Sequence, residues 1–164
     1  NSLLFCKGLD MKPKNKVLLG DLDNPDYEKL LQNKDIDSIQ NQNLKYAYTF
    51  KDTLIYGGLL TSDFTFTYHD YDQGFDKTWG RDEEMSSAYG LFSNIQMLDL
   101  TWNNIILSTQ QDSLTSNIIR SFNLRITFNP TDVVTVDGRV NLTLHKDIVS
   151  EKWQINRWID ESNF

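Results

Sequence analysis

The sequence contains few of the residues on which disulfide scaffolds and metal sites depend. Its 164 residues include one cysteine, Cys6, three prolines and two histidines. A single cysteine excludes an intrachain disulfide and any zinc site built from several cysteines. The histidines, His69 and His145, are far apart in the sequence, and no close-spaced cluster of metal ligands occurs. We therefore expect neither a metal nor a cofactor.

The chain also lacks long apolar runs and a surplus of basic residues. No apolar run approaches the roughly 20 residues that a membrane-spanning helix needs. Lys and Arg number 16 against 23 Asp and Glu, a net charge of −7, so binding to nucleic-acid phosphates is not expected. A Gly-x-Ser-x-Gly nucleophile motif and a glycine loop for phosphates are absent. With 39% hydrophobic residues the chain can bury the core of one domain.

The first 24 residues have no apolar periodicity, and we predict a linker or tether over 1–24 and a folded domain over 25–164. Within the linker, residues 1–6 look like the end of a signal-peptide apolar region that leads into Cys6, with Leu3 three residues before it. This is similar to a relaxed bacterial lipoprotein cleavage box, although Phe5 is larger than the residue usual there. This pattern predicts a lipid anchor at Cys6 and a location in the cell envelope, either periplasmic or membrane-anchored. The alternative is an ordinary N-terminal segment with a stray apolar run.

Helical signals occupy the first half of the chain. We predict a short helix at 25–31, a longer one that starts at Asp37 or Ser38, and another short one over about 53–60. The longer helix has an apolar stripe, which consists of Ile39, Leu44, Ala47 and Tyr48. An amphipathic helix over 80–94 follows, with a stripe of Met85, Ala88, Tyr89 and Phe92 and three acidic residues in its first turn.

Strict apolar/polar alternation then predicts antiparallel strands. The predicted strands are 64–69, 97–107, 117–128, 139–146 and 152–160. We interpret 61–63 as a turn, 70–78 as a loop, and 129–138 as a long hairpin connection because Pro130 cannot donate to a ladder. Helices followed by strands indicate an α+β fold, in which three helices pack on a curved, mostly antiparallel sheet of about five to six strands that forms a cone.

Over residues 36–161 this pattern resembles the nuclear transport factor 2-like superfamily, also called cystatin-like, ketosteroid-isomerase-like or SnoaL-like. The segments that carry the resemblance are 45–52 running into 59–66, then 79–84, and the closing 153–160. The resemblance implies the cone fold. It does not imply one activity, because the superfamily includes isomerases, dehydratases, cyclases, transport factors and domains without known activity.

Strand parity suggests where a ligand would bind. Arg120 shares parity with Ile118 and Phe122, and Arg157 shares parity with Ile155. A guanidinium among core residues is costly unless it is paired, so the two arginines either hold an anionic ligand at the mouth of the cone or form structural ion pairs. Aromatic side chains would line the same cavity or simply fill the core; these are Tyr48, Tyr68, Tyr89 and Trp102.

Catalysis of the ketosteroid-isomerase type needs a carboxylate base in an apolar pocket. The candidates are Asp52, Asp99 and Asp160, but none clearly has the apolar parity, and Asp99 is expected to face solvent or a partner subunit. The two histidines also have the polar parity and are expected outside the cone. We therefore assign no catalytic residue.

The expected function is binding of a small ligand or a protein partner rather than catalysis. The alternative is a small enzyme of the isomerase, dehydratase or cyclase kind with a cavity aspartate as general base. The outer sheet face carries mainly Thr, Asn and Ser, and Trp158 shares parity with polar residues. A homodimer through that face, with Trp158 in the interface, is a further expectation.

Overall fold

The computed structural model describes residues 43–162, and in this part of the chain three helices accompany one six-stranded sheet. The predicted linker, the lipid anchor at Cys6, the helix at 25–31 and the start of the next helix lie outside the described residues. The helices are α2 (Lys45–Phe50), α3 (Thr53–Gly58) and α4 (Arg81–Asn94). The strands are β1 (Leu60–Asp70), β2 (Phe75–Gly80), β3 (Met97–Gln110), β4 (Thr115–Asn129), β5 (Asp132–Lys146) and β6 (Trp153–Asp160).

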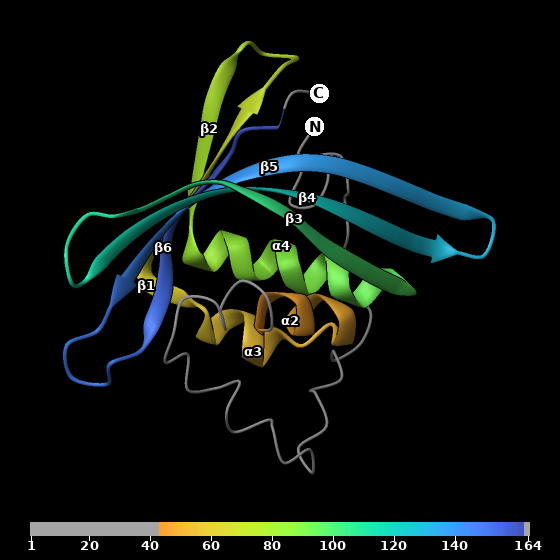
Figure 1. The fold of residues 1–164 in the computed structure, drawn as a ribbon. Coiled ribbons are helices and arrows are strands. Elements are labelled where there is room, and N and C mark those ends of the chain that lie inside the picture. The colour runs from red at the N-terminus through yellow and green to blue at the C-terminus, as the bar shows by residue number, and fades with distance from the viewer. Residues whose placement is uncertain (1–42, 163–164) are drawn as a thin grey trace.

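The strand order in the sheet is β2-β1-β6-β5-β4-β3. Neighbouring strands are antiparallel except β1 and β6, which run parallel. The sheet arches over α4, with α2 and α3 on the same side of it (Figure 1). The predicted fold class, three helices on a curved and mostly antiparallel sheet, is confirmed.

The predicted apolar stripes explain how the helices attach to the sheet. On α4, Ala88 and Phe92 are buried, and Met85 and Tyr89 pack partly buried against the core. On α2 and just before it, the predicted Leu44, Ala47 and Tyr48 are all at most 1% exposed. The remaining member of that stripe, Ile39, lies outside the described residues.

A sharp turn and a cap separate α2 from α3. Lys51 ends α2 in the left-handed conformation at φ 54°, and the next residue, Asp52, is the N-cap of α3. Asp52 Oδ1 accepts hydrogen bonds from the backbone N–H groups of Leu54 and Ile55, both at 3.0 Å. These bonds satisfy two of the amides that a helix N-terminus leaves without partners.

Replacement of Asp52 by alanine should therefore destabilise the domain by about 1 to 2 kcal/mol, the usual cost of a lost cap. Asp52→Asn should recover most of the loss, because an amide oxygen can accept the same bonds. Urea denaturation followed by tryptophan fluorescence measures both variants. Equal stability of Asp52→Ala and the parent protein would contradict the capping role.

Three connections predicted from the sequence are wrong. Residues 61–63, predicted as a turn, belong to β1, and the loop predicted at 70–78 contains the start of β2. β2 was missed because it is a short edge strand with little alternation, held by its pairing to β1. The connection predicted at 129–138 is a tight turn, because Asn129 pairs with Asp132 and Pro130 sits between them without interrupting a ladder.

A bulge in β6 inverts the parity predicted for its second half. Thr143 of β5 pairs with Arg157, but the next residue pairs with Ile155, so Asn156 is an extra residue. Beyond it, Trp158 is 3% exposed in the core, and Arg157 is exposed. Our placement of Arg157 among core residues and of Trp158 on the outer face is therefore wrong.

Candidate functional site

A buried carboxylate joins three elements at one end of the domain. Glu84, in the first turn of α4, has no exposed surface. Its Oε1 accepts a hydrogen bond from Tyr56 Oη on α3 at 2.7 Å, and its Oε2 accepts one from Trp79 Nε1 on β2 at 2.7 Å. Both carboxylate oxygens are thus engaged by protein donors.

The surroundings of Glu84 favour its neutral form. Burial raises the pKa of Glu84 to about 7, and the hydrogen bonds from Tyr56 and Trp79 oppose part of this rise. Burial, followed by the nearby Glu84 charge, raises the pKa of Tyr48 and of Tyr56 well above the usual 10. The tyrosines therefore remain protonated donors, while Glu84 changes its charge near neutral pH.

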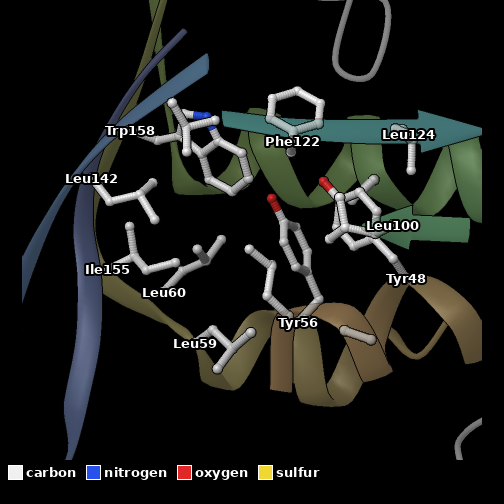
Figure 2. Close-up of a cluster of buried hydrophobic side chains, with 14 of the residues drawn as sticks. Tyr48, Tyr56, Leu59, Leu60, Leu100, Phe122, Leu124, Leu142, Ile155 and Trp158 are labelled. Carbon is white, nitrogen blue, oxygen red and sulfur yellow. The ribbon is translucent and has the colours of Figure 1, made fainter. Parts of the chain in front are cut away.

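Side chains occupy the interior of the cone around this cluster. Tyr48, Tyr56 and Phe92 contact one another edge to face, with ring centroids 5.6 to 6.0 Å apart. Trp158 lies above them, 6.1 Å from Phe66 between ring centroids. Figure 2 shows the two tyrosines rising from the helices toward residues of the sheet. Large side chains therefore occupy much of the described part of the interior.

An open groove of about 780 Å³ lies outside this core. Its walls come from α3, the start of β1, the first turns of α4 and the segment that enters β6. The lining residues are Thr53, Leu54, Gly57, Gly58, Leu60, Ser62, Arg81, Asp82, Met85, Lys152 and Gln154. We call this surface the α3–α4 groove.

Two hydrogen bonds position the polar lining of the α3–α4 groove. Arg81 Nη2 donates to the carbonyl oxygen of Gly57 at 3.0 Å, which holds the guanidinium at the wall. Gln154 Nε2 donates to the carbonyl oxygens of Gly58 and Leu60 at 3.1 and 3.2 Å, and so ties β6 to the end of α3. Lys152 adds a second cation to the lining.

The two adjacent glycines of α3 have different roles. A Cβ at Gly57 would lie 3.1 Å from Met85 Cε and 3.2 Å from Arg81 Nη2, whereas a Cβ at Gly58 would meet nothing within 4 Å. Gly57 therefore permits the close approach of α4. Gly58 borders open space in the groove.

The site residues predicted from the sequence do not converge on one pocket. Tyr48 is buried in the core, and Tyr68 is 5% exposed beside Phe66 and Trp79. Tyr89 packs partly buried on α4. Their roles in ligand binding stay predictions.

Arg120 and Trp102 do form a pair. The Arg120 guanidinium lies 5.5 Å from the centre of the Trp102 ring, and its Nε donates to the carbonyl oxygen of Asn103 at 2.8 Å. Arg120 is half-buried, whereas Arg157 is exposed. The expected joint action of Arg120 and Arg157 at the mouth of the cone stays a prediction.

None of the three predicted bases is placed for proton abstraction in the cone. Asp52 is buried, but its Oδ1 caps α3. Asp99 is exposed, as expected, and pairs across strands with Arg125. Asp160 Oδ1 accepts from the backbone N–H of Ser162 at 3.0 Å.

Both histidines are exposed, as their parity predicted. His69 Nδ1 lies 2.7 Å from Asp76 Oδ1 on the neighbouring strand. Within residues 43–162 no group of three His, Cys, Asp or Glu side chains could hold a metal ion. The helices described there are all too short or too polar to cross a membrane.

Glu84 is not among the site residues predicted from the sequence, although a signal is present there. Glu84 precedes Ala88 by four residues and Phe92 by eight, which places it on the buried stripe of α4. From the sequence, Glu84 counts with Asp82 and Glu83 as one of three first-turn acids that complement the helix dipole. The aromatic donors that make its burial tolerable, Tyr56 and Trp79, come from other elements and are not evident from the helix alone.

No family model matches the sequence, and no curated protein matches it. Solved structures do match the fold. A protein from Novosphingobium aromaticivorans, provisionally named a scytalone dehydratase, aligns with a TM-score of 0.67 at 14% identity, over 83% of this chain and 87% of that one. A nuclear transport factor 2-like superfamily protein from Salmonella enterica serovar Typhimurium aligns with a TM-score of 0.61 at 12% identity, over 84% and 93%.

A third structure comes from Nostoc punctiforme and is described as a domain of unknown function with a cystatin-like fold. It aligns with a TM-score of 0.59 at 13% identity, over 79% of this chain and 75% of that one. Identities this low establish a shared architecture and no shared chemistry. The chain therefore has the nuclear transport factor 2-like, cystatin-like fold.

Proposed function

We propose that this domain is a non-catalytic binding module that takes a small organic acid in the α3–α4 groove. The observation that carries the proposal is a contrast between two places. In the interior, both oxygens of the buried Glu84 are engaged and large side chains fill the surroundings. The groove, in contrast, is open and lined by Arg81 and Lys152.

The lining of the groove favours an anion with an apolar body. One hydrogen bond to the carbonyl oxygen of Gly57 holds the Arg81 guanidinium. The other N–H groups of the guanidinium have a geometry that suits a carboxylate. Leu54, Leu60 and Met85 supply an apolar wall. Asp82 in the lining and the net charge of −7 oppose highly charged phosphates. A monocarboxylate with an aliphatic or aromatic body fits these features.

A titration with hexanoate tests the proposal, with hexanamide and inorganic phosphate as comparison ligands. In heteronuclear NMR spectra, hexanoate should shift backbone signals of the groove residues, and hexanamide should not. Lys152→Gln should weaken hexanoate binding roughly tenfold because one of two cations is lost. Gly58→Leu should abolish binding, because its side chain would enter open space in the groove.

Matched variants separate binding from general effects. Lys146→Gln removes a lysine at the other end of the same β5–β6 connection, outside the groove lining, and should bind hexanoate normally. Gly58→Ala is too small to fill the groove and should also bind. Shifts scattered over the surface, or unchanged binding by Gly58→Leu, would refute the proposal.

A second candidate function rests on Glu84. A carboxyl group with a pKa of about 7 suits a general base at neutral pH, which favours the small isomerase-like or dehydratase-like enzyme. Such an enzyme would exchange α-protons of ketones for deuterium, and Glu84→Gln would abolish the exchange. We expect no exchange above background, because a substrate would have to displace Tyr56 or Trp79.

The location in the cell envelope and the lipid anchor at Cys6 remain part of this proposal. Mass spectrometry of the protein isolated from its native cells would detect a lipid on Cys6. An unmodified thiol there would remove the anchor from the proposal and leave the binding site untouched.

A further inference from the structure

One edge of the sheet is unusually apolar and exposed. In the described part of the chain β3 is the last strand of the sheet, with β4 as its neighbour on one side only. Three consecutive aliphatic residues on β3 are exposed: Ile105 by 47%, Ile106 by 54% and Leu107 by 47%. Together they form an exposed apolar stretch along the strand.

The position of this segment explains its exposure. The β3–β4 hairpin extends sideways beyond the three helices, which therefore do not cover it (Figure 1). Register shifts next to Ile105 mark an irregular ladder toward β4.

Of the usual protections of an edge strand, this segment has the register shifts next to Ile105 but no charge and no proline. Exposed edges normally carry charges, prolines or inward-pointing lysines that prevent pairing with another chain. From Leu100 to Gln111 the sequence contains neither a charged residue nor a proline. The chain otherwise carries a net charge of −7, so two copies repel one another except where they meet through a neutral surface.

We propose that the β3 edge pairs with the β3 edge of a second copy of this chain, antiparallel and about a twofold axis at Ile106. In this register Ile106 faces Ile106 of the second copy. Residues equally far from Ile106 on either side face each other, so Asn103 faces Thr109. No charged residue opposes another of the same sign, since Asp99 and Asp112 lie outside the paired segment. An extended peptide of another protein is the competing occupant.

The opposite edge of the sheet explains why pairing would end at a dimer. β2 forms that edge, is six residues long and carries Asp76 and Lys77. A short, charged edge resists pairing, so a β3-to-β2 contact that would extend the sheet indefinitely is disfavoured. A β3-to-β3 contact uses the same surface on both copies and closes upon itself.

Sedimentation velocity of the full chain over a range of concentrations tests the proposal. The weight-average mass should rise from monomer toward dimer. Higher salt should strengthen association, because it screens the repulsion between two acidic chains. Ile106→Lys should weaken dimerisation by roughly tenfold or more, since two lysines would face each other at the axis. Val133→Lys, a matched change of an exposed strand aliphatic away from this edge, should leave it unchanged.

Disulfide trapping tests the register independently. In a Cys6→Ser background, Ile106→Cys should form a dimer on mild oxidation, because directly opposite residues of an antiparallel pair lie within reach of a disulfide. Asn103→Cys, several residues from the axis, should not. A strict monomer at all concentrations would overturn the proposal. A dimer that Ile106→Lys leaves intact would also overturn the proposal, and it would favour the outer sheet face as the interface.

Discussion

Glu84→Gln should make the domain more stable at pH 8 and leave its stability near pH 4 almost unchanged. Burial raises the pKa of Glu84 from 4.5 to about 7, so the folded state favours the protonated carboxyl group. The stabilisation from this preference is fully present below pH 4.5 and is lost as the pH rises to about 7. The loss amounts to roughly 3 kcal/mol at 1.36 kcal/mol for each unit of pKa.

Glutamine keeps the neutral hydrogen-bond pattern at every pH. Its Oε1 can accept from Trp79 Nε1, and its Nε2 can donate to the hydroxyl oxygen of Tyr56. Urea denaturation between pH 4.5 and 8.5 should therefore show a falling stability for the parent protein and a flatter profile for Glu84→Gln. Glu83→Gln removes an exposed acid from the same turn and should keep the parent profile. Parallel profiles for the parent and Glu84→Gln would show that Glu84 does not titrate in this range.

Gly138→Ala should destabilise the domain by roughly 1 to 3 kcal/mol through overpacking. Gly138 on β5 pairs with Phe122 on β4, and the Phe122 ring lies over it. An added Cβ would lie 2.6 Å from Phe122 Cζ and would also clash with Ser162 Oγ, closer than such contacts allow. Ser162 cannot move freely, because its Oγ accepts a hydrogen bond from the backbone N–H of Arg139.

Two further variants identify the cause of the Gly138→Ala effect. Gly58→Ala adds the same methyl group where no atom lies within 4 Å, and it should be neutral or slightly stabilising because alanine favours a helix. The double variant Gly138→Ala with Phe122→Leu should cost less than the sum of the single changes, since the smaller side chain relieves the clash. Additive losses would mean that the Phe122 ring is not the obstacle.

The two buried features have a common consequence for function. At both Glu84 and Gly138 the interior is closely packed, and its polar groups already form internal hydrogen bonds. A ligand that entered there would have to displace a tyrosine, a tryptophan or a phenylalanine ring. The α3–α4 groove requires no such displacement, which is why the proposed binding function is assigned to it.

The outer sheet face likewise satisfies many of its own polar groups. Asn103 donates to Asn123, which in turn donates to Asp137 on the next strand. A second series of side-chain hydrogen bonds joins Asn117, Asn141 and Glu161. The dimer expected through this face would gain little from these side chains, and Trp158, expected in its interface, is buried on the other side. The β3 edge is the better-supported surface for a second copy.

The sequence by itself determined the elements whose pattern is local. Alternation from Ile118 to Ile126 and the stripe from Ala88 to Phe92 predict a strand and a helix, because side-chain direction repeats every two residues or every 3.6. Buried residues at both places confirm the two predictions. The α+β fold and its cone follow from the order of such elements, together with the resemblance of their sequence segments.

The tertiary structure alone decided features that depend on partners distant in the chain. One extra residue at Asn156 reverses the faces of Arg157 and Trp158, since a bulge depends on pairing with β5 and leaves no mark on the alternation itself. The burial of Glu84 depends on two donors from other elements, and the α3–α4 groove combines three separate segments of the chain. Strand and helix patterns report where a side chain points, but pKa shifts and binding surfaces depend on what lies opposite it.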